Sequence, residues 1–199
     1  EDKKKAADEE KVKIDGEDSG LTPIGMPVDG TFVIAGPPAS GRTTALRTAI
    51  ASRRRMQPDV ELVLLAPGRS ALADELPWYA LAQDPDDAAE LAERMQDVLR
   101  TSSPRQWVVV LENPADMLNG PADLPLQDLV KTARSTGQLV LAEGDTQSLS
   151  GSWGLVSAVR YSRRGLVLQP DQTDGDTLFR TTFPRVRRAD FPLGRGLLV

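Results

Sequence analysis

The chain has 199 residues, of which 40% are hydrophobic and 27% charged, proportions that are typical of a soluble globular protein with one sizeable core. Its net charge of −5 argues against a surface that coats nucleic acid. The chain contains neither cysteine nor histidine, which excludes disulfides, thiolate metal sites and the most common general base.

A highly charged stretch at residues 1–20 has no apolar face, which predicts a linker or leader before a single domain at residues 21–199. Within the stretch, Val12 and Ile14 have the spacing of a short edge strand. The abrupt start indicates a piece of a longer protein. The sequence shows no signal peptide and no apolar run of the ~20 residues that a membrane helix needs. If the domain works at a membrane, other segments or partners must place it there.

From residue 31 onward, short apolar runs alternate with stretches of helical periodicity. The runs predict strands at residues 31–35, 61–66, 107–111, 138–142 and 165–169, and an edge strand at 194–199. The periodic stretches predict helices at residues 42–54, 86–99, 122–135 and 152–160. Apolar strands separated by amphipathic helices are typical of α/β proteins, so we expect a mainly parallel sheet with helices on both faces.

The turn between the first strand and the first helix has the pattern of a phosphate-binding loop. It consists of Gly36, Pro37, Pro38, Ala39, Ser40, Gly41, Arg42, Thr43 and Thr44. Such glycines let backbone N–H groups wrap phosphates at the start of a helix, and a hydroxyl from Thr43 or Thr44 would reach Mg²⁺. The loop therefore predicts ATP or ADP as a ligand, with Mg²⁺ held through Thr43. The alternative is a strand-to-helix turn that only needs the glycines.

Arg42 stands where such loops usually carry lysine. A guanidinium keeps the positive charge near the phosphates, but it is bulkier than an ammonium and is not expected to reach the β- and γ-phosphates in the same way. We therefore expect that nucleotide binding survives and that turnover is reduced.

The apolar run that begins at Trp107 ends in Glu112 and Asn113 and has the form of a Walker B strand. An aspartate at the first position would hold the Mg²⁺ shell, and a following glutamate would polarise the attacking water. Glu112 is one methylene longer than aspartate, and the amide of Asn113 cannot accept a proton as a base would. We interpret the pair as a Walker B remnant and assign no catalytic residue. The alternative is a core strand that ends in a polar turn.

Glu143 follows the strand on which P-loop motors place a sensor of the γ-phosphate. A carboxylate there would repel phosphate, so we expect a solvated turn. Trp78, Tyr79 and Trp153 stand beside turn residues; core packing is expected, with a peptide-binding surface as the alternative.

Eight arginines lie near the end of the sequence: Arg160, Arg163, Arg164, Arg180, Arg185, Arg187, Arg188 and Arg195. They are interleaved with Asp171, Asp174, Asp176 and Asp190. The mixture favours a solvated face of salt bridges over a patch for nucleic acid. Action of one arginine on a neighbouring module's nucleotide stays open.

Several segments carry a resemblance to a known family: GPPASGRTTALRTAI, WVVVLENPADML, ARSTGQLVLAEGDTQS, QPDQTDGDTLF and the closing FPLGRGLLV. Over residues 21–199 the chain resembles an FtsK/SpoIIIE-type ATPase module. More narrowly, it is similar to the C-terminal, degenerate ATPase domain of the EccC/EssC coupling proteins of bacterial type VII secretion. The closing block is more specific to this family than the phosphate loop.

The resemblance implies a RecA-like P-loop NTPase fold, in a cytoplasmic domain of a membrane-anchored parent that carries several such modules. In this family the last module is associated with recognising the C-terminal signal of small WXG-type secreted proteins. The implied partners are that tail and the neighbouring ATPase modules. The sequence departs from the active pattern at Arg42, Glu112, Asn113 and Glu143, so weak or no hydrolysis is expected.

Two other functions stay open. A DNA-translocating motor of the FtsK type would need an intact Walker lysine and an acidic pair, which the sequence lacks, so DNA is not an expected partner. A purely structural or regulatory relic would bind neither nucleotide nor a secreted tail.

Overall fold

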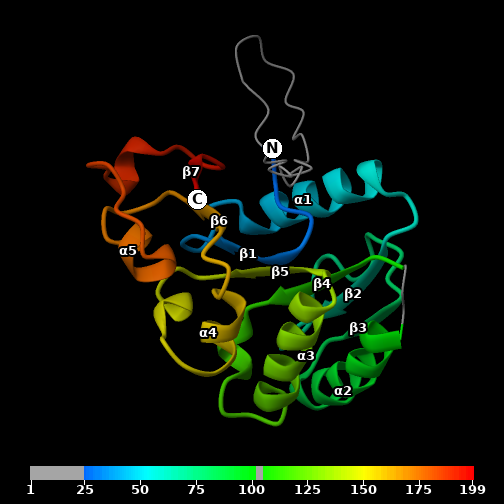
Figure 1. Ribbon diagram of the computed structural model, residues 1–199. Coiled ribbons are helices and arrows are strands. Elements are labelled where there is room, and N and C mark those ends of the chain that lie inside the picture. Colours follow the sequence, from blue (N-terminus) through cyan, green and yellow to red (C-terminus); the bar gives the residue numbers. More distant parts are fainter. Residues whose placement is uncertain (1–24, 102–104) are drawn as a thin grey trace, which may run out of the picture.

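A seven-stranded sheet organises the computed structural model, which describes residues 25–101 and 105–199 (Figure 1). The strands are β1 (Gly30–Ala35), β2 (Glu61–Leu65), β3 (Ala80–Ala82), β4 (Trp107–Glu112), β5 (Leu139–Gly144), β6 (Gly165–Leu168) and β7 (Gly196–Leu198). Their order is β3-β2-β4-β5-β1-β6-β7, and every neighbouring pair is parallel except β6 and β7. The expected mainly parallel α/β sheet is confirmed.

Helices cover both faces of this sheet, as the sequence predicts. Figure 1 shows α1 (Arg42–Met56) on one side, with α2 (Pro85–Thr101), α3 (Asp123–Ser135) and α4 (Gly154–Val159) on the other. The short helix α5 (Asp174–Phe179) lies beside α4. Three single turns of 3₁₀ helix complete the elements: η1 (Pro114–Met117), η2 (Ser148–Ser150) and η3 (Arg188–Asp190).

The alternation of side chains along the strands divides the core into two layers. Phe32 and Ile34 of β1 pack with Ile50 of α1, whereas Val33 and Ala35 belong to the layer beneath α2, α3 and α4. Every residue of β4 and β5 is buried. A strand that is buried on both faces reads as a continuous apolar run, and this is the pattern that predicts these strands from sequence.

Helix α2 shows why the periodic stretches were predictable. Its buried side chains are those with helical spacing: Ala88, Leu91, Ala92, Met95 and Leu99. The helix begins at Pro85, where the missing N–H costs nothing, and the carboxylate of Asp84 accepts hydrogen bonds from the N–H groups of Asp86 and Asp87. Periodicity and start signal therefore agree.

The structure differs from the sequence predictions at short elements. Strand β3 and helix α5 were not predicted, because three and six residues are too few to display a period. The helix predicted at residues 152–160 is shorter, since α4 spans Gly154–Val159. The expected leader at 1–20, with the edge strand at Val12 and Ile14, lies outside the described residues.

Gly165 at the start of β6 offers a test of the packing between the sheet and α5. A Cβ atom there would lie 2.3 Å from the carbonyl oxygen of Val33 and 2.7 Å from Cζ of Phe179. Because backbone must shift to accommodate it, we expect Gly165→Ala to lower the free energy of unfolding by about 1–3 kcal/mol. Urea denaturation measures this change. Gly68→Ala is the matched control, because no atom lies within 4 Å of its Cβ position; equal losses in both variants would contradict the packing argument.

Candidate nucleotide site

The predicted phosphate loop follows β1 at the carboxyl end of the parallel strands, the edge at which α/β proteins bind ligands. Gly41 has a φ of 101°, in the left-handed region that favours glycine, and it immediately precedes α1. Gly36 is required for another reason: its Cβ atom would lie 2.5 Å from Oγ of Ser40. Within the loop, the N–H of Ser40 donates to the carbonyl oxygen of Pro37 at 3.2 Å.

The first turn of α1 presents unused donors beside this loop. Helical geometry leaves the first N–H groups, those of Arg42, Thr43 and Thr44, without partners inside the helix. The side chains of Thr43 and Thr44 are exposed, and in the described part of the chain their hydroxyls make no hydrogen bond. The loop thus offers backbone donors and free hydroxyls close together in sequence, the kinds of group that bind phosphates and Mg²⁺, and the nucleotide site stays a prediction. The assignment of Thr43 to Mg²⁺ stays a prediction.

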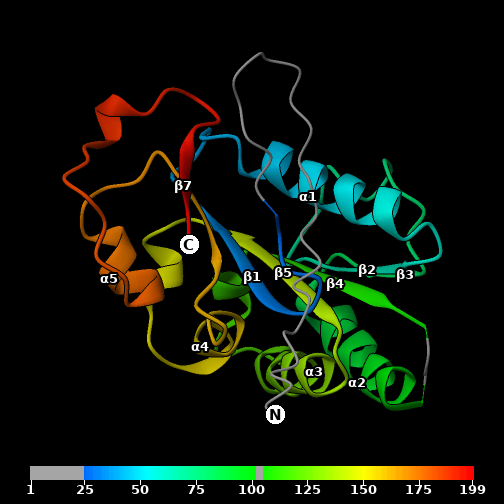
Figure 2. The same cartoon turned by 45° about the horizontal axis from the view of Figure 1, so that its top comes forward.

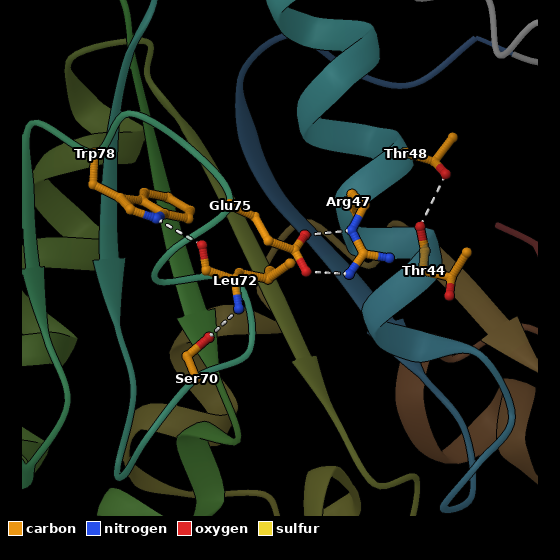
Figure 3. A network of polar contacts seen from close by, with 7 residues as sticks. All are labelled: Thr44, Arg47, Thr48, Ser70, Leu72, Glu75 and Trp78. Carbon is orange, nitrogen blue, oxygen red and sulfur yellow. Dashed lines mark hydrogen bonds and ion pairs between the residues drawn. The ribbon is translucent and has the colours of Figure 1, made fainter.

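Side-chain contacts fix α1 against the connection between β2 and β3 (Figure 3). Two nitrogens of Arg47 donate to the two carboxylate oxygens of Glu75 at 2.6 and 2.7 Å. Within the same helix, the hydroxyl of Thr48 donates to the carbonyl oxygen of Thr44, one turn earlier, at 2.9 Å. The ion pair is exposed, so it orients the helix more than it stabilises the fold.

Arg42 is engaged inside the protein. Its Nε lies 3.3 Å from Oε2 of Glu143, and the two side chains are only 18% and 6% exposed. The expectation of a solvated turn at Glu143 is therefore wrong. Strand β5 extends to Gly144, so Glu143 is a strand residue between β1 and β4, and burial rather than solvent surrounds its carboxyl group.

The two predicted acidic positions meet at this point. Glu112 is the register partner of Glu143 on the neighbouring strand, and both are buried. Burial raises the pKa of Glu143 to about 7; Arg42 opposes this shift and Glu112 adds to it. Burial also raises the pKa of Glu112, opposed by a hydrogen bond from Ser70. Two buried carboxyl groups thus lie side by side, and one of them, that of Glu143, pairs with the Arg42 guanidinium.

Asn113 is placed next to this cluster by the backbone. It has a φ of 43° and precedes η1, and its N–H donates to the carbonyl oxygen of Glu143 at 2.8 Å. The structure thus brings together Arg42, Glu112, Asn113 and Glu143, the four positions that depart from the active pattern. An amide at Asn113 leaves that position without a proton acceptor.

The segment before β7 touches the loop, a contact that the sequence analysis missed. The N–H of Gly194 donates to the carbonyl oxygen of Ser40 at 3.1 Å, and a Cβ on Gly41 would lie 3.6 Å from Cα of Gly194. Figure 2 shows this segment passing beside the start of α1. The two glycines at 194 and 196 could have indicated a sharp turn and a close backbone contact here. Gly194 has a φ of 77°, and a Cβ at Gly196 would lie 2.1 Å from the carbonyl oxygen of Val167.

The predicted face of salt bridges is largely wrong. Among the eight arginines, only Arg164 and Arg187 form ion pairs within the described residues, with Asp29 at 3.6 Å and with Asp190 at 3.4 Å. Arg160 is half-buried and bonds to backbone carbonyl groups instead.

The aromatic predictions have mixed outcomes. Trp153 is 54% exposed, which contradicts core packing there. Trp78 is half-buried and donates from Nε1 to the carbonyl oxygen of Leu72 at 3.0 Å. Tyr79 is 52% exposed, although its ring meets that of Trp107 edge-on at a centroid distance of 4.8 Å.

None of the helices within residues 25–101 and 105–199 is both long enough and apolar enough to cross a membrane. The described side chains also form no cluster of three or more acidic residues that would hold a metal ion.

No protein-family model and no curated protein sequence matches the chain. Solved structures do match. EccC of Thermomonospora curvata (ATPases 2 and 3, in complex with a signal sequence peptide) has a TM-score of 0.70 and 18% identity, over 90% of this chain and 36% of that chain. The cytoplasmic domain of EssC has a TM-score of 0.64 and 14% identity, over 96% of this chain and 40% of that chain. EssC (ATPases 2 and 3) from Geobacillus thermodenitrificans has a TM-score of 0.66 and 15% identity, over 94% of this chain and 38% of that chain.

These likenesses confirm the fold. The chain has the RecA-like P-loop fold of the EccC/EssC ATPase domains, as its sequence segments suggested. It spans between 36 and 40% of the length of the matching chains, so it corresponds to a part of them.

The raised pKa of Glu143 predicts a dependence of stability on pH. Because the folded protein holds this proton more tightly than the unfolded chain does, the stabilisation is complete below the ordinary glutamate range and declines as pH rises through about 7. Between about pH 5.5 and about pH 8, we expect the loss of the Glu143 proton to lower the free energy of unfolding of the wild-type protein by ~2 kcal/mol. The variant Glu143→Gln should lack this part of the decline. Urea denaturation at both pH values measures this.

The control is Glu75→Gln, the same substitution at an exposed carboxylate whose pKa is lowered by its hydrogen bond with Arg47. Because its pKa is lowered, Glu75 changes its protonation only at acidic pH, below the interval tested. A decline as steep in Glu143→Gln as in the wild-type protein would contradict the assignment of the proton to Glu143.

Proposed function

We propose that residues 21–199 form one nucleotide-binding, hydrolysis-poor module of a type VII secretion motor. In this proposal the module binds ATP or ADP through residues 36–44 and recognises the C-terminal signal of small WXG-type secreted proteins. It works in the cytoplasm as part of a membrane-anchored parent, beside neighbouring ATPase modules. The observation that carries the proposal is the ion pair between Arg42 and Glu143.

The loop supports binding by its donors. Backbone N–H groups at the start of α1 and the hydroxyls of Thr43 and Thr44 would hold the phosphates and Mg²⁺, and bound nucleotide would stabilise the fold by mass action. The contact between Gly194 and Ser40 fixes the shape of the loop from the outside. These features need no lysine.

The ion pair supports poor turnover. The Arg42 guanidinium, which would offset charge on the transferred phosphoryl group, is already neutralised in part by Glu143. Glu143 is buried and paired with Arg42, Glu112 is buried as well, and Asn113 carries an amide instead of a carboxylate. The position next to the strand end therefore lacks the carboxylate that would take a proton from water.

The fold supports the peptide-binding part of the proposal. The EccC structure with a TM-score of 0.70 contains a signal sequence peptide, and its matching part covers 90% of this chain. The net charge of −5 and the absence of the acidic pair favour a secretion module over a DNA motor.

Nucleotide affinity tests the role of the ion pair. Calorimetric titration with ATP and Mg²⁺ should show saturable binding to the wild-type chain, without phosphate release. Glu143→Gln should tighten Kd by about tenfold at pH 8, because it removes a carboxylate that repels phosphate and frees Arg42. The gain should shrink at about pH 6, where Glu143 is already protonated.

Gly41→Ala is the matched loss variant, since a φ of 101° strains any residue other than glycine. It should abolish binding, whereas Gly68→Ala should not. Steady ATP hydrolysis by the wild-type chain would refute the hydrolysis-poor module, and absence of ATP binding would favour a structural relic.

Peptide recognition is tested independently of hydrolysis. Titration with the C-terminal tail peptide of a WXG-type protein encoded beside the parent protein should give a Kd in the micromolar range, or about −8 kcal/mol. The titration is repeated with ATP to measure any coupling between the two sites. A scrambled tail of the same composition is the control. Equal binding of both peptides, or of neither, would contradict signal recognition.

A further inference from the structure

A second polar cavity lies between α4 and α5, apart from the nucleotide loop. It has a volume of about 670 Å³ and is lined in part by Ser150, Ser157, Arg160, Arg163, Asp176 and Arg180. We call it the Arg160 cavity. Arg163 comes just before β6, at the amino ends of the parallel strands, whereas the nucleotide loop follows the carboxyl end of β1. Figure 1 shows α4 on the opposite side of the sheet from α1, with α5 beside it at the β6 edge.

Arg160 is held rigidly but is not neutralised. Its Nη1 donates to the carbonyl oxygen of Thr177 at 2.6 Å, and its Nη2 donates to the carbonyl oxygen of Gly151. Its Nε is shielded from solvent and has no partner among the described residues. A half-buried guanidinium that bonds only to backbone oxygens keeps its full charge, and such a charge is costly unless an anion lies nearby.

Two more cations face the same cavity. Arg163 and Arg180 are exposed, and neither has a carboxylate within ion-pair distance in the part of the chain that the structure describes. Burial, together with the nearby charge of Arg180, lowers the pKa of Arg160. The guanidinium groups thus repel one another in the free protein, and an anion between them would relieve this repulsion.

The charge of the lining selects the kind of anion. Three arginines and the carboxylate of Asp176 give a net charge of +2, within a chain whose total is −5. Asp176 is itself occupied, because its Oδ1 accepts a hydrogen bond from the hydroxyl of Thr182 at 3.2 Å. A phosphate monoester carries between roughly −1.5 and −2 at pH 7, which matches the lining.

We propose that the Arg160 cavity binds the phosphate group of a small phosphorylated molecule. The exposed Arg163 and Arg180 would contact the phosphate oxygens, because the guanidinium fork suits charge-assisted bonds to phosphate, and Arg160 would add positive charge at the cavity wall. The hydroxyls of Ser150 and Ser157 supply further donors at the cavity wall. The volume lies within the range of small-molecule sites. This site is independent of the proposed nucleotide binding and peptide recognition.

The test is a titration of the 199-residue chain followed by amide chemical shifts in NMR, which locates binding residue by residue. Inorganic phosphate and glycerol 3-phosphate are the two probes. Saturable shifts at Ser150, Ser157 and Arg163 are expected, separate from any shifts at Gly41 and Thr43. Tighter binding of glycerol 3-phosphate identifies an organic monoester as the ligand, and equal binding identifies free phosphate.

Variants locate the charge. Arg163→Ala with Arg180→Ala should weaken Kd by about tenfold or more, since two charge-assisted contacts are lost. Both side chains are exposed, so the fold is expected to persist. The control variant is Arg55→Ala with Arg94→Ala, which changes the net charge by the same amount at exposed positions of α1 and α2.

Four results would overturn the proposal. The first is a linear, non-saturating response at the cavity, and the second is an equal loss of affinity in the control. The third is a response to an acetylated tetraglutamate peptide but to neither phosphate probe, which would assign the cavity to an acidic protein segment. Shifts confined to Gly41 and Thr43 would likewise reject the cavity and leave the proposed function untouched.

Discussion

The contact between Arg42 and Glu143 ties the first turn of α1 to the strand that separates β1 from β4. Both side chains are mostly buried, and the loss of hydration of each charge costs free energy. The attraction between the two charges offsets part of this cost. Glu112, across the register, adds a second carboxyl to a region with one guanidinium. The charge of the whole site is therefore set by protonation within the sheet rather than by solvent. The predicted phosphate loop is thereby joined to a buried polar cluster at the end of the sheet strands.

The parallel sheet explains why these groups meet. The carboxyl ends of parallel strands lie at one edge, so the loop after β1 and the last residues of β4 and β5 converge although they are far apart in sequence. The register of β4 and β5 is constrained on both faces, because a slip by one residue would exchange the side chains that pack in the two core layers. The apolar strands thus determine the positions of the polar residues that follow them.

Much of this architecture was predictable, for identifiable reasons. The helical period of α2 and the apolar runs of β4 and β5 are long enough to read, and the glycine spacing of the loop has a direct steric cause. The environment of Glu143 was not predictable, because its burial follows from pairing with strands on both sides. The same holds for Arg160, whose partners are backbone oxygens of η2–α4 and α5. Side-chain identity alone does not reveal such partners.

The hydrogen bond between Gly194 and Ser40 has a consequence for the order of folding. It joins two residues separated by most of the chain, so the loop acquires its final support only through a contact of very large sequence separation. A nascent chain still lacking Gly194 would already contain every residue of the loop, yet this contact would not hold Ser40. During synthesis, which proceeds from the N-terminus, the loop therefore gains this support only after Gly194 has been made.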